Sequence, residues 1–251
     1  MPDGERTTPG HDGPPLLVLL HGLGGTAAVW DEWSDVLEKS WPGPWLAVDL
    51  PGHGHAPPLR RYSFGSIAAH VAEVLPPGRP VVALGHSLGG VVALALSSGW
   101  FGVHVTGVVG LGIKVGWTDD ELGRAAGLAA RPVAWFDDRS EAAARYLKVS
   151  GLVGLRGVDD PAVAAGLREQ DGRWRLALDP AAFGVGAPDM AGLLAATRAD
   201  VVLARGEHDR MVTDEQLADL PASTAALPGL GHNAHVEAPA AVAALLQPWM
   251  T

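Results

Sequence analysis

The chain of 251 residues contains no cysteine, which excludes disulfides, thiol nucleophiles and cysteine-ligated metals. Charged residues are also scarce, at 18% of the chain, and they sum to a net charge of −10. Because an acidic protein is repelled by nucleic acid and by anionic membrane surfaces, neither is expected as a partner. No apolar run approaches the length of a membrane span. These absences leave a small molecule as the expected partner.

The N-terminus lacks the positively charged segment and following apolar stretch that mark a secretory signal peptide. Residues 1–15 instead read MPDGERTTPGHDGPP, a polar stretch rich in proline and glycine that predicts a disordered lead-in. A cytoplasmic protein is therefore expected. The composition leaves open whether it is a monomer or a homodimer.

Hydrophobic residues make up 47% of the chain, enough for a sizeable core, and many of them fall in six short runs. Near-continuous apolar runs that alternate with helical patterns are typical of a parallel sheet covered on both faces. We therefore predict an α/β fold with a mostly parallel sheet of about six strands flanked by helices. The predicted strands are residues 16–20, 45–49, 81–85, 105–113, 201–205 and 223–227.

The long interval between the predicted strands at residues 105–113 and 201–205 contains helical signals but no clear strand. A capping box at Thr118 and Glu121 marks one helix start within it. Since a structureless loop of this length is improbable in a compact domain, residues 114–196 are predicted to form an inserted helical cap. The core then comprises residues 16–113 and 197–251.

A G-x-S-x-G motif lies between an apolar strand and an apolar helix in VVALGHSLGGVVALAL, residues 81–96. In this strand–turn–helix context the central Ser87 is exposed on a sharp turn, and small residues on either side allow strand and helix to approach closely. The adjacent helix N-terminus favours developing negative charge. The pattern indicates that Ser87 is a nucleophile.

A second glycine-rich turn, His21-Gly22-Leu23-Gly24-Gly25, directly follows the first predicted strand. Such a turn can direct a backbone N–H at the same point as the turn after Ser87. The amides of Leu23 and Leu88 are therefore the predicted oxyanion donors. His21 is interpreted as a structural residue that packs this turn.

A serine nucleophile needs a base, and the base needs an acid that orients it. Asp209 follows the strand at residues 201–205, at the sheet edge where Ser87 is also expected. Glu207 and Asp214 are competing carboxylates, interpreted as solvated turn and helix-start residues. His232 comes later in the chain, so that the order is serine, aspartate, histidine.

The region around His232 allows another interpretation. In LPGLGHNAHVEAP, residues 227–239, two histidines and Glu237 are spaced so that they could bind zinc or iron together. The motif alone does not distinguish this metal site, made of His232, His235 and Glu237, from a catalytic base.

From about residue 16 to its end the chain resembles the α/β-hydrolase superfamily. The residues that carry the resemblance are LLHGLGG, DLPGHG, GHSLGG, ARGEHD and GHNAHVEAP. The resemblance places the base at His232 and leaves His235 and Glu237 to begin the next helix, so neither a metal nor another cofactor is expected. Family members usually have one or two additional strands before the first one here, which implies a trimmed sheet.

The resemblance implies hydrolysis of an ester, thioester, amide or lactone through an acyl-enzyme, with the cap selecting the substrate. Alternatives are a carbon–carbon bond hydrolase, a lyase that uses the same triad, or a binding protein without catalysis. Nine tryptophans suggest a mainly apolar substrate. The residues expected to contact it are Trp30, Trp117, Trp135 and His86, and Lys114 could pair with a substrate carboxylate.

Overall fold

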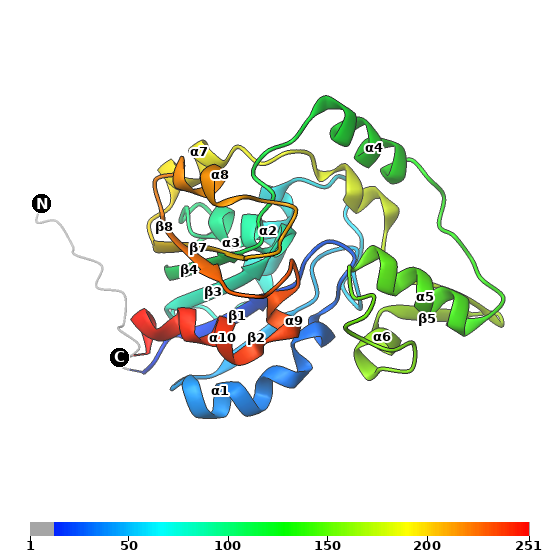
Figure 1. Ribbon diagram of the computed structural model, residues 1–251, viewed down its shortest axis with the longest axis horizontal. Coiled ribbons are helices and arrows are strands. Elements are labelled where there is room, and N and C mark those ends of the chain that lie inside the picture. Colours follow the sequence, from blue (N-terminus) through cyan, green and yellow to red (C-terminus); the bar gives the residue numbers. More distant parts are fainter. Residues whose placement is uncertain (1–12, 251) are drawn as a thin grey trace, which may run out of the picture.

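The structure, a computed structural model, describes residues 13–250, so residues 1–12 of the predicted lead-in lie outside the described residues. Its centre is a six-stranded sheet in which every neighbouring pair is parallel, in the order β2-β1-β3-β4-β7-β8 (Figure 1). The predicted α/β fold class and mostly parallel sheet are confirmed. The strands are β1 (Leu16–Leu20), β2 (Trp45–Val48), β3 (Val81–His86), β4 (Val105–Leu111), β7 (Asp200–Gly206) and β8 (Ser223–Leu227).

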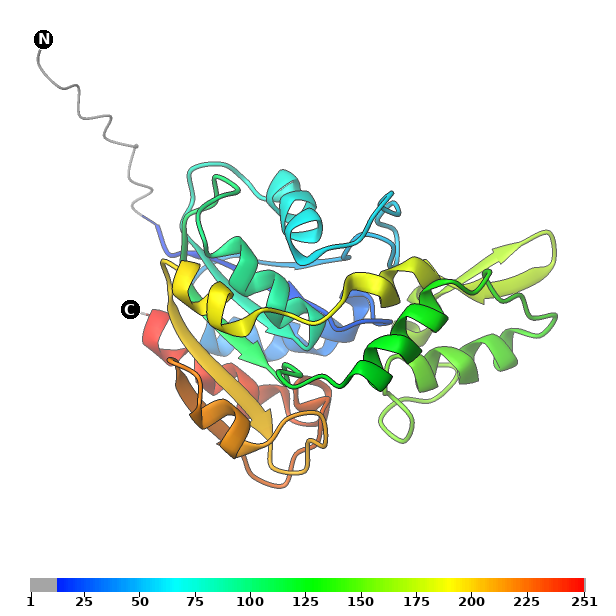
Figure 2. The same ribbon diagram turned by 90° about the horizontal axis from the view of Figure 1, so that it is seen from above.

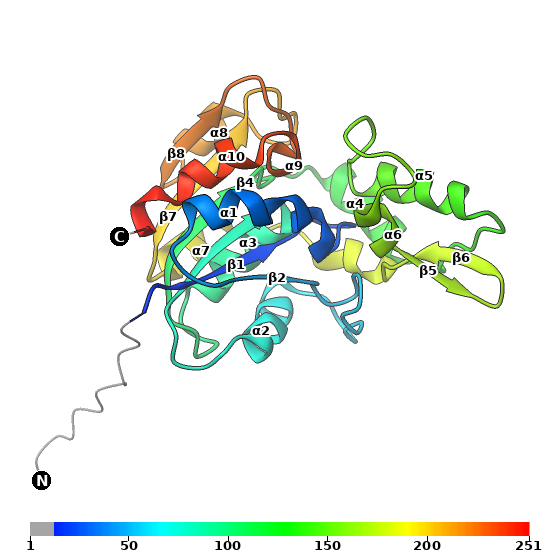
Figure 3. The same ribbon diagram turned by 90° about the horizontal axis from the view of Figure 1, so that it is seen from below.

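Helices cover both faces of the sheet, because alternate strand residues enter two separate clusters of buried side chains. In β1, Leu16, Val18 and Leu20 pack on one face, while Leu17 and Leu19 pack on the other. The first face carries α2 (Phe64–Val74), α3 (Leu88–Leu96), α7 (Met190–Ala196) and α8 (Asp214–Ala218) (Figure 2). The second carries the 3₁₀ helix η1 (Ala27–Trp33), α1 (Ser34–Ser40), α9 (Ala234–Glu237), α10 (Pro239–Ala243) and the 3₁₀ helix η3 (Ala244–Trp249) (Figure 3).

The strand order reverses between β1 and β3. These strands are direct neighbours, with Leu20 opposite Gly85, but the chain leaves β1 toward β2 and leaves β3 toward β4. At such a switch point the two connecting segments separate and leave a crevice at the carboxyl ends of the strands. The turn at residues 21–25 and the turn at Ser87 therefore lie side by side at the crevice.

The chain between β4 and β7 extends beyond the carboxyl ends of the strands (Figures 1 and 2). This insertion is mostly helical, but it also contains an antiparallel hairpin that the sequence analysis did not predict. Its elements are α4 (Asp119–Ala129), α5 (Arg139–Val149), α6 (Pro161–Ala165), β5 (Leu167–Gln170), β6 (Arg173–Leu176) and the 3₁₀ helix η2 (Pro180–Val185).

The last part of the predicted cap, α7, packs on the core. Its residues Met190 and Leu194 are buried in the cluster that also contains α3. The segment of residues 114–196 therefore returns to the sheet before its predicted end. Within the described residues, no helix is both long and apolar enough to cross a membrane.

Side-chain caps begin several of the helices at residues that the sequence marks for this role. Thr118 accepts a hydrogen bond from the Glu121 amide, and Glu121 bonds back to the Thr118 amide. Asp160 caps α6 ahead of Pro161. Each cap satisfies amides that have no partner within their helix.

The close approach of α3 to the end of β1 is predicted to depend on the missing Cβ of Gly89. A Cβ at this position would collide with the backbone carbonyl of Leu20, which cannot move without disturbing the sheet. We expect Gly89→Ala to lower the free energy of unfolding by about 1–3 kcal/mol, as overpacking does. Gly123→Ala in α4 is the control, because its Cβ would meet open space.

Since alanine favours a helix over glycine, the control should be neutral or raise the stability by about 0.5–1 kcal/mol. Chemical denaturation followed by circular dichroism measures both variants. Equal stability of Gly89→Ala and the unsubstituted protein would contradict the close approach of α3 to β1.

Candidate active site

Ser87 occupies the turn between β3 and α3 in a conformation rarely adopted by residues other than glycine. Its φ is 50° and its ψ is −113°. The turn is tight because Gly85 and Gly89 approach each other: a Cβ on Gly85 would collide with the Gly89 backbone. Strain of this kind persists only where the surrounding structure enforces it, and it is concentrated at functional sites. The turn places Ser87 at the crevice.

Asp209 and His232 form a hydrogen-bonded pair from the loops that follow β7 and β8. The distance between Asp209 Oδ2 and His232 Nδ1 is 2.9 Å, and the Asp209 side chain is fully buried. Its other oxygen, Oδ1, accepts a hydrogen bond from the Met211 amide at 2.8 Å. With both oxygens held, Asp209 fixes the orientation of the His232 ring and leaves its Nε2 available.

The competing carboxylates point elsewhere. Glu207 accepts a hydrogen bond from the Gly229 amide at 2.7 Å, and Asp214 pairs with Arg205 at 2.8 Å. Of the three candidates, the structure brings only Asp209 to His232.

Ser87 and His232 line one cavity of about 780 Å³. Among the described residues, no hydrogen bond joins the side chains of Ser87 and His232. In enzymes this contact is often long before substrate binds. The volume lies within the range of small-molecule sites.

His86, predicted to contact the substrate, also supports His232. Its Nε2–H donates to the backbone carbonyl of His232 at 3.0 Å, and the centroids of the two rings are 4.6 Å apart. On its other side His86 packs against His235, with ring centroids 4.2 Å apart. Burial lowers the pKa of His86 well below its ordinary value and that of His235 to about 3, so both rings are neutral. Sequence reasoning missed this support.

The two predicted oxyanion donors, the amides of Leu23 and Leu88, belong to residues that line the cavity. Neither amide donates a hydrogen bond to any group in the described part of the chain. His21 stabilises the turn at residues 21–25 through two hydrogen bonds. Its Nδ1–H donates to the Gly22 carbonyl at 2.8 Å, and its Nε2 accepts a hydrogen bond from the Leu50 amide at 2.9 Å. The amides of Leu23 and Leu88 are therefore free to bind an oxygen atom of a ligand.

The alternative metal site does not assemble. His232 pairs with Asp209, Glu237 accepts a hydrogen bond from the Gly231 amide at 2.8 Å, and the His235 ring lies buried between His86 and Trp30. Nowhere in residues 13–250 do three histidine or acidic side chains gather as metal ligands.

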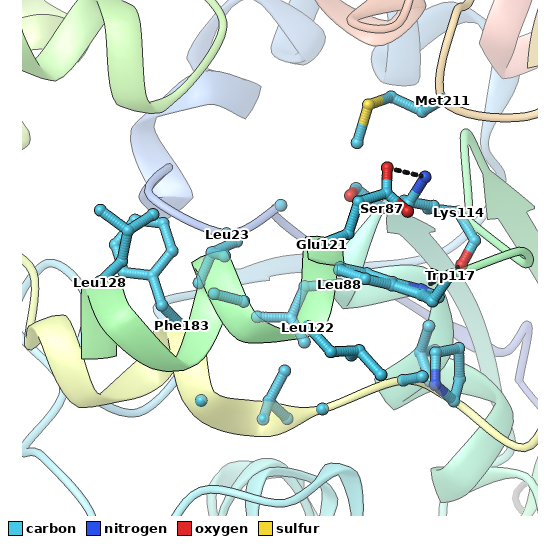
Figure 4. A pocket seen from close by; sticks show the side chains of 18 of the residues that line it. Leu23, Ser87, Leu88, Lys114, Trp117, Glu121, Leu122, Leu128, Phe183 and Met211 are labelled. Atoms are coloured by element: carbon cyan, nitrogen blue, oxygen red, sulfur yellow. Dashed lines mark hydrogen bonds and ion pairs between the residues drawn. The ribbon is translucent and has the colours of Figure 1, made fainter. Parts of the chain in front are cut away.

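Two of the predicted substrate contacts are wrong. Trp30 is fully buried in the core, where it packs against Trp33 and His235, because η1 turns this side chain toward the sheet. Trp135 lies on the cap near Arg175, with its ring 5.7 Å from the guanidinium, and does not line the cavity. Trp117 does line it (Figure 4).

Much of the cavity wall comes from residues that sequence reasoning did not single out (Figure 4). One side of α4 contributes apolar side chains, and α4 has no fully buried residue. The spacing of the apolar residues in α4 indicated that they lie on one side of the helix, but it did not show that this side would line a cavity. The apolar wall includes Phe64, Leu122, Ala125, Leu128, Phe183, Val185 and Met211.

The chain from residue 17 to residue 245 matches the model of a family described as "Alpha/beta hydrolase family". A 2-succinyl-6-hydroxy-2,4-cyclohexadiene-1-carboxylate synthase of Enterobacter sp. (strain 638) is 29% identical over 96% of this chain and 93% of its own length. A pimeloyl-[acyl-carrier protein] methyl ester esterase of Methylococcus capsulatus is 38% identical, but only over 32% of this chain and 30% of its own length.

Solved structures share the fold along nearly the whole chain. An esterase from Mycobacterium tuberculosis superposes with a TM-score of 0.70 and 26% identity over 93% of this chain and 83% of its own. A thioesterase domain from the curacin biosynthetic pathway gives a TM-score of 0.73 at 21% identity, over 95% and 93%. Because the family model spans nearly all of the sequence and these structures share its architecture, the chain belongs to the alpha/beta hydrolase family.

Proposed function

We propose that this protein is a serine hydrolase that cleaves a carboxylic ester, thioester or lactone of a mainly apolar small molecule through an acyl-enzyme. The observation that carries the proposal is the position of Ser87, in a strained turn on the same cavity as the Asp209–His232 pair. Strain and a hydrogen-bonded base serve no evident purpose in packing, whereas nucleophilic catalysis needs both.

In the proposed reaction, Ser87 Oγ attacks the carbonyl carbon of the substrate while His232 Nε2 takes the hydroxyl proton. Asp209, bonded to Nδ1, stabilises the resulting imidazolium. The amides of Leu23 and Leu88 bind the oxyanion of the tetrahedral intermediate. Collapse of this intermediate expels the leaving group, which receives the proton from His232. Water then attacks the acyl-enzyme in the same way and frees Ser87.

The names of the relatives support ester chemistry. Two of them are called esterases, and the Mycobacterium tuberculosis protein aligns over most of both chains. The apolar cavity wall supports a mainly apolar substrate, since a desolvated apolar group binds there without leaving polar atoms unpaired.

A second candidate is a non-hydrolytic reaction that uses the same three residues. It is favoured by one observation: the relative from Enterobacter sp., which aligns over 93% of its length, is named a synthase. An enzyme of this kind would react with a serine-directed probe yet turn over none of a panel of esters, thioesters and lactones.

Replacing Ser87 by alanine should abolish ester hydrolysis and leave the fold intact, because the side chain lies on a turn and makes no hydrogen bond to any residue that the structure describes. Loss of a serine nucleophile typically lowers kcat by about 10⁴- to 10⁶-fold. Turnover of 4-nitrophenyl esters and labelling by a fluorophosphonate probe measure the change. If Ser87→Ala kept its turnover and its labelling, the serine mechanism would be wrong.

Replacing Asp209 by asparagine should lower kcat by about 10⁴-fold, since an amide no longer stabilises the imidazolium or selects the required tautomer of His232. Glu207→Gln is the matched control, because Glu207 is an acidic residue of the same loop whose side chain, within the described residues, bonds only the Gly229 amide. The control should retain most of its activity. Equal losses in the two variants would show that Asp209 has no special role.

A further inference from the structure

The cavity carries more positive than negative charge although the protein is strongly acidic. Three cationic side chains line it, those of Lys114, Arg124 and Lys148, against a single carboxylate, that of Glu121. The whole chain has a net charge of −10, so this local excess runs against the charge of the molecule.

One of the three cations is already neutralised. Lys114 Nζ lies 3.0 Å from Glu121 Oε1, and the two side chains point toward each other in the cavity wall (Figure 4). The backbone of Thr118 donates to Glu121 and, with Lys114, lowers its pKa to about 2, so the carboxylate remains charged. The Lys114 ammonium also lies 5.3 Å from the centroid of the Trp117 ring. This pair therefore forms a neutral part of the wall.

The other two cations have no acidic partner among the described residues. Arg124 on α4 and Lys148 on α5 form no ion pair and no hydrogen bond, and both are exposed while also lining the cavity. They come from different helices of the cap, so the cavity has an unpaired cation on each. We refer to Arg124 and Lys148 as the rim cations.

Most of the other side chains that line the cavity are apolar. Leu122, Ala125 and Leu128 of α4 face the cavity, and no residue of this helix is fully buried. A ligand with an apolar segment would cover these side chains, and a negative group at one end of it could reach the rim. Apolar wall and charged rim together are complementary to an amphiphilic anion.

Resting on the proposed esterase function, we propose that the substrate carries a negatively charged group which binds at Arg124 and Lys148 while its apolar part fills the cavity. An acidic protein repels anions at a distance, and unpaired positive charges in the cavity wall counteract this repulsion locally. The negative group belongs either to the acyl chain or to the leaving group, and these two sources call for different substrates in the test.

The test compares esters that differ only in charge. For the acyl side, mono-4-nitrophenyl glutarate is compared with 4-nitrophenyl valerate, which has the same chain length. For the leaving group, S-butyryl-4′-phosphopantetheine is compared with S-butyrylpantetheine, which lacks only the phosphate. We expect a higher kcat/KM for the anionic member of at least one pair, and the pair that shows it identifies the source.

The double variant Arg124→Gln/Lys148→Gln should lose about 3- to 30-fold of this preference, since exposed ion pairs contribute modestly. In this variant the kcat/KM of the anionic ester should fall more than that of its neutral partner. The matched control is Arg131→Gln/Arg145→Gln, which removes the same charge from two exposed residues close to the rim cations in sequence. Their side chains form no ion pair within residues 13–250 and do not line the cavity. Raising the salt concentration should weaken the preference in the unsubstituted protein.

Equal or better hydrolysis of the neutral member in both pairs would overturn the inference. So would a control variant that loses as much of the preference for the anionic ester as Arg124→Gln/Lys148→Gln does. Binding of the same esters to the Ser87→Ala variant, measured by calorimetry, tests the inference without turnover. If the anionic ester bound more tightly there but none of the esters was hydrolysed by the intact protein, the proposed function would be wrong and the inference would stand. If the neutral esters were hydrolysed with no preference for charge, only the inference would be wrong.

Discussion

The contact between α3 and the carboxyl ends of β1 and β3 is the constraint on which the site depends. Because Gly85 and Gly89 have no Cβ, the helix begins directly above the sheet and forces Ser87 to a positive φ. The same contact puts the turn after β1 next to the turn after β3, which brings Leu23 and Leu88 to one cavity. In a sheet whose strands are all parallel, Asp209 and His232 reach this edge as well, since both follow strands that end there. The site thus follows from the chain direction together with one close approach.

The strands could be predicted from the sequence because their signals are local, whereas the resemblance to the α/β-hydrolase superfamily was needed to identify His232 as the partner of Asp209. Apolar runs mark strands that are buried on both faces, and the turn around Ser87 has few alternatives once its glycines are recognised. The hairpin β5–β6 gave no such signal: its strands read LREQ and RWRL, half-exposed segments without an apolar run. Trp30 was misplaced for a similar reason, since only tertiary packing decides which way a 3₁₀ helix turns a side chain.

Helix α4 of the cap differs from the core helices in how it is stabilised. The core elements bury their apolar residues against the sheet, whereas α4 directs its apolar face at a cavity and packs mainly against η2. Its start is fixed by the capping box of Thr118 and Glu121, and Glu121 also links it to Lys114, which follows β4 in the core. One carboxylate therefore begins the helix and links it to the residue that follows β4, so that α4 is held near the site without a buried face of its own.

Four buried histidines affect the stability of the protein in acid. Burial lowers the pKa values of His21, His53, His86 and His235 in the folded state, those of His53 and His235 to about 3, whereas an unfolded chain titrates each near 6.5. Between these values the unfolded chain binds more protons than the folded one, so the free energy of unfolding falls as the pH is lowered from about 6.5 toward 3. The packing that orients His232 at neutral pH thus makes the core, and with it the whole molecule, sensitive to acid.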